Sequence, residues 1–192
     1  MRVALVTGGG SGIGRSAALE LNKIDFTVYV VGRREEELIK TSSLATNNNH
    51  KIIPIKTDIT IGSQVVDLFD IIKSDHGRID LLFNNAGMGA PRVPIEDLKE
   101  EDWRKTVDVN LTGSFLCSQQ AIKLMKNQSP QGGRIVNNGS VSAHSPRPDT
   151  IAYTATKHAV NGLTKSIALD GRNFNISLSL IHISEPTRHG LI

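Results

Sequence analysis

A glycine-rich segment near the amino terminus constrains the fold of this chain more than any other feature. The segment covers residues 7–14 (Thr-Gly-Gly-Gly-Ser-Gly-Ile-Gly), directly follows an apolar run at 3–6 and opens a helix-like stretch at 12–24. In such a strand–loop–helix unit, glycines permit a tight turn, let the backbone approach a pyrophosphate and allow the helix to pack closely. The helix N-terminus then presents free N–H groups to the anion. The segment therefore predicts a dinucleotide site made by Gly8, Gly10, Ser11, Gly12, Ile13 and Gly14.

Short apolar runs alternate with longer helical patterns along the rest of the chain. Several of the runs are apolar throughout, which is typical of parallel strands buried on both faces. The expected strands are 3–6, 27–31, 51–55, 79–83, 134–137 and 175–183, and the expected helices are 12–24, 34–46, 61–76, 99–127 and 151–171. This alternation predicts an α/β fold, a three-layer, Rossmann-type, doubly wound parallel sheet of about six strands.

Composition and charge argue against several other classes. The 192 residues suffice for one domain with a buried core. The single cysteine, Cys117, excludes a disulfide framework, and the six histidines show no metal-ligand spacing. The net charge is only +3 with scattered basic residues, and no apolar run approaches the ~18 residues of a membrane span. We therefore expect a cytoplasmic protein with no metal site, no nucleic-acid partner and no membrane association.

Four further motifs follow the glycine segment in order. Asn84-Asn85-Ala86-Gly87 comes directly after the strand expected at 79–83, Asn110 lies inside the helix expected at 99–127, and Ser140 follows the strand expected at 134–137. Tyr153 and Lys157 form a Tyr-x-x-x-Lys pattern that begins thirteen residues after Ser140. Together with the spacing Thr-Gly-x-x-x-Gly-x-Gly, this set resembles the short-chain dehydrogenase/reductase (SDR) family from Arg2 to about Ser179.

The resemblance implies a catalytic set of Asn110, Ser140, Tyr153 and Lys157. Residues four apart on a helix share one face, so Tyr153 and Lys157 are expected to lie together. Tyrosine hydroxyls ordinarily hold their proton up to about pH 10, and a neighbouring ammonium favours the phenolate. We therefore expect Tyr153 to be the general acid/base and Lys157 its activating partner. The resemblance also assigns the nicotinamide ribose to Lys157, the substrate oxygen to Ser140 and a relay water to Asn110.

A hydrolase and a nucleotide-sensing module are competing interpretations. Ser140 lies in Asn138-Gly139-Ser140-Val141-Ser142, which lacks the Gly-x-Ser-x-Gly turn of a serine hydrolase. A sensing module would have no use for all four predicted catalytic residues. We therefore expect an oxidoreductase whose partner is a small carbonyl or alcohol substrate. The resemblance also implies a homodimer surface on the helices expected at 99–127 and 151–171.

The residues after the second expected strand bear on the cofactor. NAD-preferring family members carry an aspartate there for the ribose hydroxyls, whereas this chain reads Val31-Gly32-Arg33-Arg34. An arginine pairs with a 2′-phosphate, which a carboxylate would repel. We expect NADP(H), held mainly by Arg33 with help from Arg34, and NAD(H) is the alternative. The remaining cofactor contacts implied by the resemblance are Asp58, Ile59, Asn85, Ala86 and Gly87.

The family pattern stops near the carboxyl end. After Ser179 the family continues with a nicotinamide-contacting loop, a substrate lid and a seventh strand, whereas residues 180–188 of this chain resemble translated sequencing-adapter sequence. We expect a dinucleotide-binding and catalytic domain at 1–179 and a tail at 180–192 that departs from the family. On this interpretation the chain is truncated or chimeric and lacks the last strand and the lid. The alternatives are a naturally short member and a non-catalytic remnant that binds dinucleotide weakly or not at all.

Overall fold

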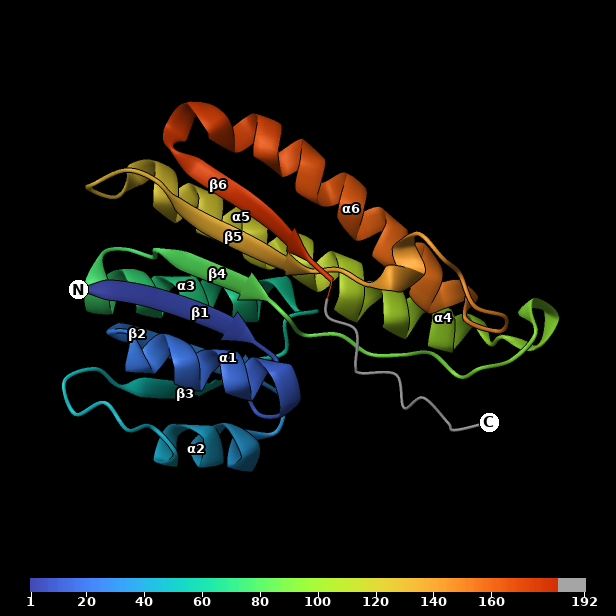
Figure 1. Ribbon diagram of the computed structural model, residues 1–192, viewed down its shortest axis with the longest axis horizontal. Helices are drawn as coiled ribbons and strands as arrows, with labels where there is room; N and C mark the ends of the chain where they lie inside the picture. Colours follow the sequence, from blue (N-terminus) through green and yellow to red (C-terminus); the bar gives the residue numbers. More distant parts are fainter. Residues whose placement is uncertain (183–192) are drawn as a thin grey trace, which may run out of the picture.

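Six parallel strands form the frame of the computed structural model, which describes residues 1–182 (Figure 1). The strands are β1 (Arg2–Thr7), β2 (Phe26–Gly32), β3 (Ile52–Lys56), β4 (Leu81–Asn84), β5 (Gly133–Asn138) and β6 (Ile176–Ile181). Their order across the sheet is β3-β2-β1-β4-β5-β6, and every neighbouring pair is parallel. Because the direction of winding reverses between β1 and β4, a crevice opens at the carboxyl ends of these two strands.

Helices cover both faces of the sheet and give the molecule three layers. α1 (Gly12–Lys23) and α2 (Glu35–Ser43) lie on one face, whereas α3 (Gly62–His76), α5 (Gly113–Asn127) and α6 (Ile151–Gly171) lie on the other (Figure 1). The doubly wound parallel sheet predicted from the sequence is confirmed. Within residues 1–182, no helix combines the length and the hydrophobicity that crossing a membrane requires.

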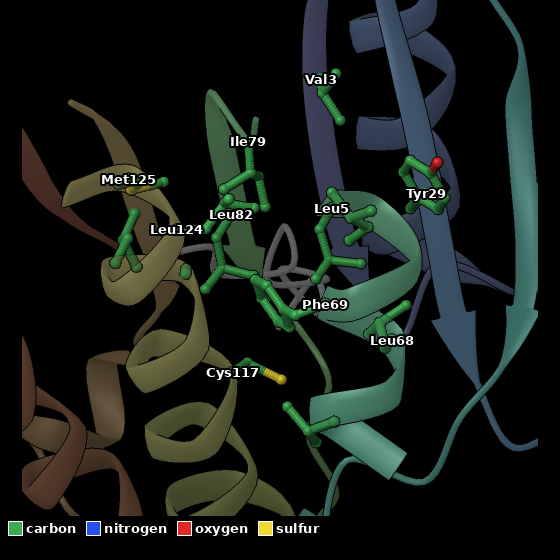
Figure 2. Packing of buried hydrophobic residues seen from close by; sticks show 14 of the residues in the cluster. Val3, Leu5, Tyr29, Leu68, Phe69, Ile79, Leu82, Cys117, Leu124 and Met125 are labelled. Atoms are coloured by element: carbon green, nitrogen blue, oxygen red, sulfur yellow. The ribbon is translucent and has the colours of Figure 1, made fainter. Parts of the chain in front are cut away.

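The sheet is buried on both sides because its strands are apolar on both faces. Leu5 and Leu82 belong to the core beneath α3 and α5, whereas Val6 and Val28 belong to the core beneath α1 and α2. Figure 2 shows the larger core, where Phe69 of α3 packs beside Leu5 and Leu82. Each fully buried side chain of this size contributes about 1.5–3 kcal/mol. This packing fixes the helices, and with them the loops at the carboxyl ends of the strands.

The helix expected over 99–127 is interrupted, so that prediction was wrong in its middle. α4 (Glu100–Val107) is followed by a π-helical turn at Asp108–Thr112 before α5 begins at Gly113. Asn110 lies in this turn and is bonded to the backbone of Met88, which is 22 residues away in sequence. Single π-helical turns occur frequently at functional sites. Because the contact is distant in sequence, helical periodicity could not predict the interruption.

Other boundaries differ by a few residues. The helix expected to reach residue 46 ends at Ser43, and the strand expected at 79–83 is Leu81–Asn84. The strand expected at 175–183 is Ile176–Ile181. Residue 183 and the rest of the expected tail beyond His182 lie outside the described residues. In the described part of the chain, β6 pairs with β5 alone and forms one edge of the sheet.

Candidate active site

Predicted residues from five separate segments meet in one groove at the carboxyl ends of the strands. The groove has a volume of about 730 Å³ and is lined by the β1–α1 loop, the end of β2, the β3–α3 loop, the β4–α4 loop and α6. Those predicted site residues that line it are Gly8, Gly10, Ser11, Ile13, Arg33, Arg34, Asp58, Ile59, Asn85, Ala86, Gly87, Tyr153 and Lys157. Residues far apart in the sequence therefore form one continuous surface.

The glycine loop has the backbone shape and the free space that an anion requires. Gly8 and Gly12 have φ angles of +66° and +51°, which side chains other than glycine rarely adopt. A Cβ atom at Gly12 would meet no atom within 4 Å, so the backbone there is open to a ligand. A Cβ atom at Gly14 would lie 2.3 Å from the Gly8 carbonyl oxygen, so only glycine lets α1 start this close to the loop. The loop fits a pyrophosphate at the N-terminus of α1.

Thr7 joins the glycine loop to the end of β4. Its Oγ1 accepts the backbone N–H groups of Asn85 (3.0 Å) and Ala86 (2.9 Å) and donates to the Phe83 carbonyl (3.3 Å). The Asn85 side chain donates in return from Nδ2 to the Thr7 carbonyl at 2.9 Å. The two loops on either side of the crevice are therefore held at a fixed separation.

Two arginines follow β2 at one end of the groove. Arg33 and Arg34 are exposed, and Arg34 is the residue before the first turn of α2. Arg34 Nη2 donates to Ser11 Oγ in the glycine loop at 3.3 Å. Further along the groove, Asp58 Oδ1 accepts the backbone N–H (3.0 Å) and the hydroxyl (2.8 Å) of Thr60. The end of the groove beside Ser11 therefore carries two exposed guanidinium groups.

Tyr153 and Lys157 lie one turn apart on α6 and both face the groove, as their spacing predicted. Lys157 Nζ lies 5.6 Å from the centre of the Tyr153 ring. It donates to the Asn138 carbonyl at 2.7 Å, and Lys157 is only 6% exposed. Burial lowers the pKa of Lys157 from 10.5 to about 8, because a poorly solvated environment disfavours the ammonium. A perturbed lysine next to a tyrosine in a groove is typical of a functional site.

Asn110 and Ser140 are not among the residues that line the groove. The buried Asn110 side chain accepts the Met88 N–H (2.8 Å) and donates to the Met88 carbonyl (2.9 Å) and to Thr156 Oγ1 (3.1 Å). It thereby ties the β4–α4 loop to α6. Ser140 Oγ accepts the Ser142 N–H at 3.1 Å, which leaves the hydroxyl proton free to donate. The water-anchoring role of Asn110 and the substrate-orienting role of Ser140 stay predictions.

Comparison with known families decides the membership of this chain. The sequence profile described as short chain dehydrogenase matches residues 2–184. The chain belongs to the short-chain dehydrogenase family. The match covers every motif on which the resemblance rests, from the glycine loop to Lys157.

Proteins similar to this chain include structures with different bound cofactors. A 3beta-hydroxysteroid dehydrogenase of Mediterraneibacter gnavus is 37% identical over 180 residues, which are 94% of this chain and 64% of the relative. The crystal structure of a metagenomic short-chain oxidoreductase in complex with NADP has a TM-score of 0.89 and 28% identity, and covers 96% of this chain and 82% of that one. The crystal structure of NAD+-bound xylitol dehydrogenase has a TM-score of 0.89 and 30% identity, and the match covers 94% of this chain and 69% of that one. The chain spans 64% to 66% of the length of three curated relatives that it matches.

Several residues that shape the site were assigned no role from the sequence, although some of them lie within the motifs. Thr7 bridges two loops, Asn138 holds Lys157, and Thr156 holds Asn110. The position of Thr7 directly before Gly8 was a usable signal, and so was the position of Asn138 at the end of a strand. Arg15, which contacts the inner side of the glycine loop, gave no such signal, because its partners lie 5 to 26 residues away.

Proposed function

We propose that this chain carries the cofactor-binding and catalytic domain of an NADP(H)-dependent oxidoreductase that interconverts a small carbonyl compound and an alcohol. The observation that carries the proposal is the single groove in which the glycine loop, the Asn85–Gly87 segment and the Tyr153–Lys157 pair meet. The proposed domain covers residues 1–179, and β6, its last described strand, continues to Ile181. Similarity to a hydroxysteroid dehydrogenase and to NADP- and NAD-bound structures supports a nicotinamide cofactor.

The residues present fit NADP(H). The pyrophosphate is assigned to the open backbone at Gly12 and to the N-terminus of α1, because a Cβ atom at Gly12 would meet nothing. The 2′-phosphate is assigned to Arg33 and Arg34, since guanidinium groups pair with phosphate in a bidentate manner. The remaining assignments are Asp58 and Ile59 for the adenine, and Asn85, Ala86, Gly87 and Lys157 for the nicotinamide side. NAD(H), the alternative, would leave the two exposed arginines without a ligand partner.

A bound nicotinamide would supply or accept the hydride, and a side chain of the protein would supply or accept the proton. In reduction the Tyr153 hydroxyl donates its proton to the substrate oxygen, and in oxidation the Tyr153 phenolate takes the proton back. The Lys157 ammonium, held by the Asn138 carbonyl at 2.7 Å, is assigned the role of offsetting the negative charge that develops on the Tyr153 oxygen during the transfer. The free hydroxyl proton of Ser140 is available to orient the substrate oxygen.

Replacing Tyr153 by phenylalanine tests this assignment. Y153F keeps the ring and removes only the proton donor, so we expect kcat/KM to fall by about 10²–10⁴-fold. NADP+ binding, measured by calorimetry, should stay within about threefold of wild type, because the phosphate contacts are unchanged. The assay is NADPH-dependent reduction of a panel of small aldehydes and ketones. Full activity in the variant would exclude Tyr153 as the proton donor.

The proposal includes a homodimer through α5 and α6. Phe115 is 44% exposed and lies with Ile122 and Ile167 in a hollow on these two helices, which is also lined by Gln119, Lys123, Lys126 and Asp170. A charge at the centre of an apolar interface is costly, so Phe115→Glu should convert the dimer into a monomer. Ile71→Glu on α3, where the isoleucine is similarly exposed, is the matched control and should leave the dimer intact. Sedimentation velocity measures both, and a wild-type monomer would refute the interface.

A further inference from the structure

A polar cluster beneath the glycine loop is not accounted for by the proposed reaction. Its centre is Arg15 in the first turn of α1, which is largely buried. Arg15 Nη2 donates to the carboxylate of Glu37 at 2.6 Å and to the Gly10 carbonyl, and Nε donates to Thr41 Oγ1 at 3.0 Å. One guanidinium group therefore joins α1, the glycine loop and α2.

Thr41 completes the cluster on the α2 side. It is fully buried, and its hydroxyl lies within hydrogen-bonding distance of the Gly9 carbonyl (2.9 Å) and of the Glu37 carbonyl (3.0 Å). The loop also touches α2 directly, since a Cβ atom at Gly10 would lie 3.1 Å from Glu37 Cβ. The inner side of the glycine loop thus rests on the first turns of α2.

The cluster lies directly behind the residues assigned to the 2′-phosphate. Ser11 follows Gly10, and α2 begins directly after Arg33 and Arg34. Contact between the loop and α2 therefore sets the separation of Ser11 and Arg34, whose side chains are bonded at 3.3 Å. A shift of either segment would move the two walls of the site apart.

Glu37 brings a negative charge to the same place. It lines the groove, where a free carboxylate would repel a phosphate and compete with it for arginine. Its carboxylate is instead bonded to Arg15, and this bond lowers the pKa of Glu37, with smaller contributions from Lys40 and Arg34. The charge of Glu37 is therefore compensated from the inner side of the loop, away from the ligand.

Resting on the proposed NADP(H) function, we infer that Arg15 is a positioning residue that sets the preference for NADP(H) over NAD(H) by holding and neutralising Glu37. Arg15 holds Glu37 and the glycine loop in place, so that Arg33 and Arg34 stay available to a 2′-phosphate. Without Arg15, Glu37 pairs with Arg34 and faces the phosphate. Neither residue touches the reacting atoms in this assignment.

The test measures the dissociation constants of NADP+ and NAD+ by calorimetry for wild type, R15M, E37Q and the double variant R15M/E37Q. We expect R15M to weaken NADP+ binding by about tenfold relative to NAD+, because the bare carboxylate opposes only the cofactor that carries the 2′-phosphate. E37Q alone should change the ratio of the two dissociation constants little. Adding E37Q to R15M should restore most of the wild-type ratio. R104M removes a similar arginine–glutamate pair on α4, whose side chains are 71% and 74% exposed, and should change nothing.

The possible failures are distinguishable. A wild-type protein that prefers NAD+ would refute the NADP(H) part of the proposed function itself. The inference alone would be overturned if the wild type prefers NADP+ but R15M weakens the binding of both cofactors equally and E37Q does not rescue it. If R15M does not unfold cooperatively, R15K takes its place. A lysine can bond to only some of the three acceptors of Arg15, so R15K should lower the preference for NADP+ over NAD+ by about threefold. An unchanged ratio in R15K would also overturn the inference.

Discussion

At the scale of single residues, the buried ammonium group of Lys157 lowers the stability of the fold and serves the proposed site. Its ammonium group is almost fully buried and has one hydrogen-bond partner among the described residues, the Asn138 carbonyl. Burial without a paired carboxylate disfavours the charged form, and the pKa of Lys157 falls to about 8. A purely structural position would be filled better by an apolar residue of similar length. The proposed role beside Tyr153 gives a reason for a lysine here.

Replacing Lys157 by methionine should therefore stabilise the protein at neutral pH. The lysine pKa is 10.5 in the unfolded chain and about 8 in the folded one, so the unfolded state binds more protons between these values. Stability of the wild type rises with pH through this window, and the cost of the buried charge is fully present below pH 8. We expect K157M to gain about 1–2 kcal/mol at pH 7 after allowing for the lost bond to Asn138.

Urea unfolding at pH 7 and at pH 10 checks this expectation. The advantage of K157M over the wild type should shrink as the pH rises from 8 toward 10.5, because the folded wild type releases the buried proton in this window while the unfolded chain still holds it. An advantage that stays constant, or a variant less stable at pH 7, would contradict the account. Loss of NADPH-dependent activity in K157M should accompany the gain in stability.

At the scale of elements, the close approach of α1 to the end of β1 depends on Gly14. A Cβ atom at Gly14 would lie 2.3 Å from the Gly8 carbonyl oxygen and 2.5 Å from Asn85 Nδ2. Both are parts of the loop network around Thr7, so the strain cannot be relieved by a flexible side chain. Gly162 in α6 is the opposite case, because a Cβ atom there would meet nothing within 4 Å.

Alanine at these two helical glycines should have opposite effects. G14A should cost about 1–3 kcal/mol or more and weaken NADPH binding, because the loop must move to make room. G162A should stabilise the protein by about 0.5–1 kcal/mol, since alanine loses less conformational entropy in a helix. Denaturant unfolding with and without NADPH measures both variants, and equal stability changes in the two would refute the packing argument.

The sequence predicted those elements whose signals are local. The six strands and their alternation with helices follow from apolar runs and helical spacing, and the position of the glycine loop follows from its residues. The π-helical turn at Asp108–Thr112 could not be predicted, because Asn110 makes its bonds to Met88 and Thr156 across the fold. The Arg15 cluster was missed for the same reason. The motifs indicated most of the residues that meet in the groove, but neither Asn110 nor Ser140 lines it, and the motifs gave no information on what holds the groove residues in place.

At the scale of the whole molecule, the groove is formed within residues 1–182 although the chain spans only 64% to 66% of the length of the three relatives. Two cores hold the strands from both faces, and the loops of β1, β3 and β4 and the helix α6 are anchored to these cores. The elements that build the cofactor groove are therefore in place within this part of the chain. The central claim is that this groove binds NADP(H).

Thermal unfolding of the purified 192-residue chain, with and without NADPH or NADH, tests that claim most directly. A ligand at 100 times its Kd stabilises a folded protein by about 2.7 kcal/mol, which is a readily measured rise in melting temperature. The account predicts one cooperative transition that NADPH raises clearly, and more than NADH does at the same concentration. No cooperative transition, or a transition that neither dinucleotide moves, would contradict it and favour a remnant that does not bind the cofactor.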